Sequence, residues 1–95
     1  MDILYLNGKD IEQIAPTDEE IIAAVEASLR AQGNGQTSIE PRVHIYPDPA
    51  YNGHFNVLRG YIAPQHVAGV KIVGDYVYNY KLGLPSELSL SLIHI

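Results

Sequence analysis

A helix signature followed only by strand-like segments sets the strongest limit on how this chain folds. Thr17-Asp18-Glu19-Glu20 has the pattern of a capping box, in which Thr17 and Glu20 satisfy each other's backbone amides. The apolar residues that follow recur every four positions and form one stripe, at Ile21, Val25 and Leu29. Gly33-Asn34-Gly35 comes next, with residues that tolerate positive φ and end helices. The sequence therefore predicts a helix over residues 18–32.

From residue 40 onward the pattern changes to that of β-strands. Segments rich in β-branched and aromatic residues are separated by Pro and Gly turns, and they predict strands at 42–46, 55–63, 67–75 and 88–95. Upstream, residues 3–6 have the pattern of a short strand, and 9–14 that of a short helix capped by Asn7. The predicted fold is α+β: a short N-terminal strand and helix, one long helix, then an antiparallel meander.

Two details concern the third predicted strand and its continuation. Gly69 and Gly74 predict bulges or a close approach of another backbone. Tyr76, Tyr78 and Tyr80 alternate with other residues, which predicts that the three tyrosines share one face of a strand.

The length of the chain predicts a single domain over residues 1–95. A domain of this size buries only about 60–65% of the surface of its unfolded chain, so we expect support from a partner chain or a second domain. The last predicted strand ends at Ile93-His94-Ile95 without a polar tail, although natural termini are usually exposed and loosely held. Either this strand pairs with another chain or the native protein continues beyond residue 95, and we favour the second explanation.

Charge and composition exclude several classes of function. Six basic against eleven acidic residues give a net charge of −5, which argues against nucleic acid and anionic membranes as partners. With no cysteine, disulfides, thiolate metal sites and cysteine nucleophiles are excluded. No apolar run approaches the roughly 18 residues that a membrane span needs. Because the N-terminus lacks the pattern of a signal peptide, we expect a cytoplasmic protein.

The sequence carries no familiar catalytic or metal-binding motif. The four histidines, at 44, 54, 66 and 94, are too far apart for a compact metal signature. No glycine-rich loop matches a phosphate or dinucleotide site, and no serine lies in a nucleophile elbow. Most carboxylates cluster in the first turn of the long helix, where capping explains them. We therefore predict no catalytic residue, metal ligand or cofactor-binding residue in this chain.

Arg42 and Lys71 are the two basic residues with a candidate function. Arg42 follows Pro41 at the start of a predicted strand, and Lys71 lies in the middle of an apolar one. An arginine fork grips both oxygens of a carboxylate and a lysine adds a point charge, so the pair could bind a carboxylate together. The pattern alone favours the alternative for Lys71, a lysine that points to solvent from a two-faced sheet.

Four segments in order resemble the ornithine cyclodeaminase/mu-crystallin family. They are the acidic-capped helix Thr17 to Arg30, Pro41-Arg42-Val43-His44, Gly69-Val70-Lys71-Ile72-Val73, and Asn79 with Gly83-Leu84-Pro85-Ser86. The resemblance extends over residues 1–88.

The resemblance implies that this chain is the substrate-binding and dimerisation region of a longer enzyme. In that family a Rossmann domain follows and binds NAD(P), and complete members act on the Cα–N bond of an amino acid as cyclodeaminases, amino-acid dehydrogenases or imine reductases. Arg42 and Lys71 correspond to binders of the substrate carboxylate, which reverses the preference for a solvent-facing lysine. The missing Rossmann domain implies that the fragment alone binds no cofactor and is inactive.

Two departures from the family pattern weaken the case for ornithine as the substrate. Leu58-Arg59-Gly60-Tyr61 stands where many members have Met-Pro-Ala before an aromatic residue. Asn56 falls near the position where ornithine-using members can carry an acid that meets the substrate amine, which makes Asn56 a third candidate for substrate binding.

The resemblance therefore implies part of an NAD(P)-dependent, homodimeric enzyme that binds a small amino or imino acid. Two alternatives remain at this point. One is a mu-crystallin-like protein that binds a small ligand without turnover. The other is a free-standing dimerisation module, in which Arg42 and Lys71 are ordinary charges on the surface of a sheet.

Overall fold

The computed structural model describes residues 1–94 and has an α+β fold. The chain forms two compact units, Met1–Arg30 and a second unit that begins at Ala31. The helices α1 (Gly8–Ile14) and most of α2 (Asp18–Gly33) belong to the first unit, and the sheet belongs to the second. Within residues 1–94, no helix combines the length and apolar character needed to cross a membrane.

Both predicted helices form, and both begin at a capping box. The Asn7 side chain accepts from the Lys9 and Asp10 amides, and Asp10 accepts from the Asn7 amide in return. At the start of α2, the Thr17 amide donates to Glu20 at 2.8 Å, and the Glu20 amide donates to Thr17 Oγ1 at 3.2 Å. Pairs of this kind supply the amides of a first turn with the acceptors that the helix itself lacks. The bounds differ from the predicted ones by one residue.

The predicted strand at residues 3–6 is wrong. These residues lie in no strand of the structure. An extended segment becomes a strand only when its amides and carbonyls pair with a neighbour, and the ladders of the described chain connect only β1, β2, β3 and β4.

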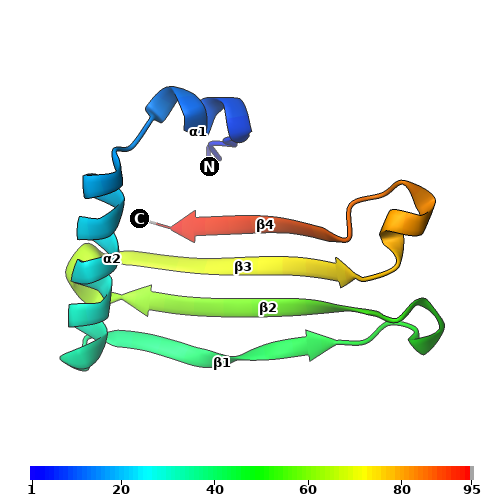
Figure 1. Cartoon of the computed structure of the whole chain (residues 1–95). Helices are drawn as coiled ribbons and strands as arrows, with labels where there is room; N and C mark the ends of the chain where they lie inside the picture. Colours follow the sequence, from blue (N-terminus) through cyan, green and yellow to red (C-terminus); the bar gives the residue numbers. More distant parts are fainter. Residues whose placement is uncertain (95) are drawn as a thin grey trace. The chain divides into compact units, whose positions relative to one another are not determined.

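Four antiparallel strands form one sheet in the order β1-β2-β3-β4 (Figure 1). They are β1 (Thr37–Ile45), β2 (Gly53–Ile62), β3 (Val67–Tyr76) and β4 (Glu87–His94). Short 3-10 turns join them at η1 (Pro49–Tyr51), η2 (Ala63–Gln65) and η3 (Asn79–Leu82). The meander is as predicted, although β1 begins five residues earlier, and Ile95, the last residue of the predicted fourth strand, lies outside the described residues.

A bulge interrupts the pairing of β1 with β2. Glu40 pairs with Arg59 and Val43 with Val57, so Pro41 and Arg42 lie together opposite Leu58. Proline has no amide hydrogen to give to a ladder, which is why it occurs in sheets at bulges and on edge strands, and β1 is an edge strand. The sequence predicted that Arg42 opens the strand, whereas the strand passes through Pro41 by means of this bulge.

The predictions for the glycines of the third strand and for the tyrosines at its end have different outcomes. Register is continuous along β3, so Gly69 and Gly74 do not mark bulges. A close approach of another backbone is present at Gly69, where an added Cβ would lie 3.3 Å from the Leu92 carbonyl oxygen; at Gly74 the close neighbour is a side chain, the Phe55 ring at 3.0 Å. The prediction that Tyr76, Tyr78 and Tyr80 share a strand face is wrong, because β3 ends at Tyr76 and the chain then turns through η3 to Gly83, whose φ is 70°.

Pairing register divides the sheet into two faces of different character. Directly paired residues share a face, and residues two apart along a strand do so as well. We call one the polar face, with Arg42, His44, His54, Asn56, Leu58, Lys71, Val73, Asp75, Glu87, Ser89 and Ser91. The other is the apolar face, with Val43, Ile45, Phe55, Val57, Val70, Ile72, Tyr76, Leu88, Leu90 and Leu92.

Candidate functional site

The three residues predicted to bind substrate lie on the polar face around Leu58. Arg42 lies opposite Leu58 in the bulge of β1, and Lys71 is the direct partner of Leu58 on β3. Asn56 is two residues from Leu58 along β2, so it lies on the same face. The bulge and the two ladders thus bring together residues from three consecutive strands.

Arg42 and Lys71 are separated by one intervening strand. Neighbouring strands lie about 4.8 Å apart, so their backbones are roughly 10 Å apart across β2. Both side chains are exposed and long, and they can close over Leu58 from either side. A carboxylate held between them would accept hydrogen bonds from the Arg42 guanidinium on β1 and from the Lys71 ammonium on β3.

Three of the four other basic residues, but not Lys9, have a partner for their charge in the described residues. Arg30 pairs with Glu26 at 2.8 Å, Arg59 pairs with Glu40, and Lys81 lies 4.2 Å from the centre of the Tyr78 ring. Within residues 1–94, Arg42 and Lys71 make no ion pair. The polar face therefore presents two cations whose charge the described chain leaves uncompensated locally.

Asn56 is the buried polar side chain of this face. Only 9% of it is exposed, and its Nδ2 lies 3.2 Å from His54 Nε2. Its Oδ1 is closed off from solvent and has no hydrogen-bond partner within residues 1–94. A buried polar atom without a partner costs about 1–3 kcal/mol, so a ligand that pairs with this amide would recover that free energy.

Sequence reasoning missed the cluster of three rings that includes His54, the hydrogen-bond partner of this amide. The centres of His44 and His54 are 5.6 Å apart, those of Tyr46 and His54 are 5.5 Å apart, and His44 and Tyr46 stack at 5.9 Å. Alternation alone places His44 and Tyr46 on one face of the predicted strand at residues 42–46. Their meeting with His54 depends on the register of β1 against β2, which neither propensity nor periodicity supplies.

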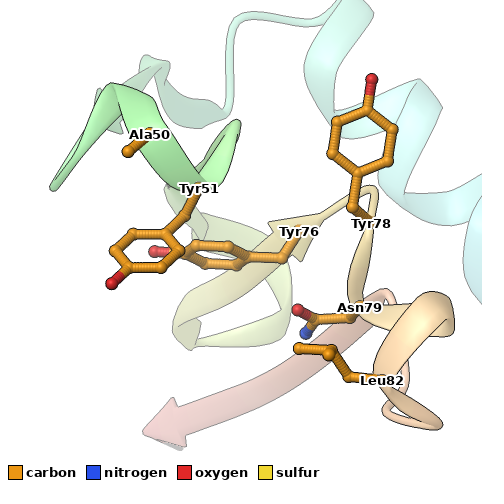
Figure 2. A pocket seen from close by; sticks show the side chains of 6 residues that line it. All are labelled: Ala50, Tyr51, Tyr76, Tyr78, Asn79 and Leu82. Carbon is orange, nitrogen blue, oxygen red and sulfur yellow. The ribbon is translucent and has the colours of Figure 1, made fainter.

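The hollows of the second unit lie away from these residues. One of about 420 Å³ is lined by Ala50, Tyr51, Tyr76, Tyr78, Asn79 and Leu82 (Figure 2). Another of about 340 Å³ lies beside the apolar residues Phe55, Ile72 and Leu88. Neither is lined by Arg42, Asn56 or Lys71; Arg42 and Lys71 are exposed on the surface of the sheet, whereas Asn56 is buried. Within residues 1–94, no three His, Asp or Glu side chains come together as metal ligands.

Comparison with solved structures supports the fold. Residues of this chain superpose on Δ1-pyrroline-2-carboxylate reductase of Thermococcus litoralis in complex with NADH and L-proline, with a TM-score of 0.74 and 29% identity over 83% of this chain. An archaeal alanine dehydrogenase dimer with bound NAD matches with a TM-score of 0.77 and 22% identity over 92% of this chain. The sheet and helices thus have the fold of part of two NAD-binding oxidoreductases.

Sequence comparison gives a further relative. Nodulation efficiency protein NfeD of Rhizobium meliloti is 26% identical over 92 residues, which cover 97% of this chain. No protein-family profile matches the chain. The chain spans about a quarter of the length of all three proteins, 28%, 24% and 25% respectively for NfeD, the reductase and the alanine dehydrogenase.

Proposed function

We propose that this chain is the substrate-binding and dimerisation region of an NAD(P)-dependent enzyme of the ornithine cyclodeaminase/mu-crystallin type, acting on the Cα–N bond of an amino acid or its imine. The observation that carries the proposal is the pair of uncompensated cations, Arg42 and Lys71, on one face of the sheet. Supporting it, the fold and 29% of aligned residues are shared with a reductase whose structure contains NADH and L-proline.

In this proposal the three residues of the polar face have separate roles. The Arg42 guanidinium binds both oxygens of the ligand carboxylate, and the Lys71 ammonium adds a second positive charge. The Asn56 amide pairs with the ligand nitrogen, which fixes the rotation of the ligand about its carboxylate. Together they orient the Cα–N bond in a constant direction relative to the sheet.

The nicotinamide cofactor belongs to another part of the protein. When bound, it exchanges a hydride with the carbon of the Cα–N bond. The predicted absence of cofactor ligands in this chain agrees with a longer protein, and the chain spans about a quarter of the two NAD-binding neighbours. The fragment alone is then expected to be inactive, and cyclodeamination, dehydrogenation and imine reduction are the activities to assay.

The proposal is tested on the full-length protein with NAD(P)-linked assays over a panel of amino acids and cyclic imino acids. Arg42→Ala and Lys71→Ala should each weaken substrate binding by about 10- to 100-fold, because each removes a charge-assisted hydrogen bond worth about 1.5–3 kcal/mol. Arg30→Ala and Lys81→Ala are matched controls that remove the same charges where Glu26 and the Tyr78 ring partner them.

Two results would contradict parts of the proposal. Absence of turnover, together with binding that Arg42→Ala and Lys71→Ala leave unchanged, would remove the assigned site. Ligand binding that depends on Arg42 without any turnover would instead indicate a mu-crystallin-like binding protein.

A further inference from the structure

Three rings lie on the polar face beside the residues proposed to hold the ligand carboxylate. We call His44, Tyr46 and His54 the ring cluster. The His44 and Tyr46 rings stack with an interplanar angle of 6°, and the His54 ring is tilted by 36° from each of them. The centres are 5.5, 5.6 and 5.9 Å apart, which is typical of favourable aromatic pairs. The proposed function leaves this cluster without a role.

The ring cluster is accessible on β1, close to Arg42. Tyr46 is 67% exposed, and His44 is also exposed. In the row of paired residues that contains His44, Asn56 and Val73 are only 9% and 7% exposed. His44 is therefore the accessible side chain of that row nearest to Arg42, from which it is two residues away, roughly 7 Å along the strand.

The opposite side of the carboxylate site has no ring in its nearest row. Two residues beyond Leu58 on that side, the row of the polar face consists of Ile39, Gly60, Gly69 and Ile93. The two glycines at its centre present only backbone, and the isoleucines at its edges are aliphatic. Contact between a ligand side chain and an aromatic ring is thus available on one side of the carboxylate site, the side of the ring cluster.

We propose that the ring cluster is a specificity subsite, which selects an amino or imino acid with an aromatic side chain. This inference rests on the proposed function, because Arg42 and Lys71 place the ligand carboxylate. In an aromatic amino acid a single methylene joins the ring to Cα, so a ligand held by its carboxylate at Arg42 can bring its ring against His44. Contact between aromatic rings stabilises the complex beyond the burial of apolar surface.

The test compares two probes, L-phenylalanine and L-cyclohexylalanine, which share a carbon skeleton and differ in whether the ring is aromatic or saturated. Calorimetry on the full-length protein at a single pH gives the ratio of their affinities. We expect L-phenylalanine to bind about three- to tenfold more tightly, which is the usual effect of an aromatic pair beyond apolar burial. A site that only buries surface would bind the more apolar cyclohexyl ring at least as tightly, and that result would overturn the inference.

Variants of the ring cluster show whether its rings cause the preference. His44→Leu and Tyr46→Leu should each lower it, His44→Leu to about twofold or less, whereas His44→Phe restores a ring and should keep it. Tyr51→Leu is the matched control, because Tyr51 lies in η1 and is 68% exposed, nearly the same as Tyr46. If the leucine variants lose stability but keep the preference, the rings only pair across strands and the inference is overturned. Loss of the preference in Tyr51→Leu would overturn it as well.

The outcomes distinguish this inference from the proposed function. Arg42→Ala should weaken the binding of both probes by similar factors and leave their ratio unchanged. If both probes bind through Arg42 without an aromatic preference, or if L-alanine binds through Arg42 and neither probe does, only the role of the ring cluster is wrong. If Arg42→Ala leaves the binding of every probe unchanged, the proposed function fails and this inference fails with it.

Discussion

At the scale of single residues, Gly53 and Tyr76 show how closely the end of the sheet is packed. Gly53 is buried, and a Cβ built on it would lie 2.1 Å from Cδ1 of the Tyr76 ring, its direct partner on β3. The same ring meets the Phe55 ring edge-on at 5.9 Å. Tyr76 therefore occupies the space that a side chain at position 53 would need.

Gly53→Ala should destabilise the protein by about 1–3 kcal/mol, because the Tyr76 ring must leave its position to admit the methyl group. Urea unfolding of the full-length protein measures this change. The matched control is Gly60→Ala in the same strand, where the nearest atom to the added Cβ is the Ser38 carbonyl oxygen at 3.4 Å. Equal losses in the two variants would show that the Tyr76 contact is not the cause.

The candidate site could be predicted from sequence only in part, and the missing part is instructive. Arg42 and Lys71 stood out by residue type and by resemblance, and Asn56 by its place relative to the family pattern. The structure places all three on the polar face, while their role in binding stays a prediction. The contact of His54 with Asn56 and with His44 was out of reach, because it depends on strand register and side-chain rotamers.

At the scale of elements, α2 depends on signals within its own sequence. The exchange of hydrogen bonds between Thr17 and Glu20 satisfies amides at its first turn. Acidic residues fill that turn and Arg30 lies in the last one, which matches the direction of the helix dipole. Local signals of this kind explain why the bounds of this helix could be predicted to within one residue.

Thr17→Ala should lower the free energy of unfolding by about 1 kcal/mol, the usual cost of losing an N-cap side chain. Thr17→Ser keeps the hydroxyl and should retain nearly all of the stability. Thermal unfolding, followed by the helix signal in far-ultraviolet circular dichroism, reports the loss as a lower Tm. A Thr17→Ser variant as unstable as Thr17→Ala would show that the hydroxyl does not provide the stabilisation.

The strands could be predicted as elements but less well at their edges. Alternation gave the four segments of the meander, yet β1 begins at Thr37 and passes through Pro41 by a bulge. From the local sequence pattern, a strand is expected to end at a proline. In the structure, β1 pairs with β2 on both sides of Pro41, so the chain stays extended there. Conversely, residues 3–6 have strand propensity but no ladder, so the prediction there was wrong.

At the scale of the whole molecule, each unit leaves apolar surface uncovered. Within residues 1–94, the apolar side chains that are buried are Ala31 and Val73. On the apolar face, Leu88, Leu90 and Leu92 are 66%, 49% and 54% exposed. In the first unit, the stripe of α2 is also exposed, at Ile21, Val25 and Leu29. Surface of this kind favours association, and we predict that the apolar face of the sheet forms the dimer contact of the proposed enzyme.

The apolar face is tested by placing a charge at its centre. Leu90 pairs with Ile72 there, and Leu90→Lys would bury two ammonium groups in a symmetric interface, where charges without partners are strongly unfavourable. We expect the dimer of the full-length protein to weaken by at least about 100-fold, as measured by size-exclusion chromatography with light scattering over a dilution series. Ser89→Lys is the matched control, since it adds the same charge to the same strand on the polar face. Because the two variants differ by one position along β4, dissociation by Leu90→Lys alone would assign the interface to the apolar face, and dissociation by Ser89→Lys alone would assign it to the face that carries Arg42 and Lys71.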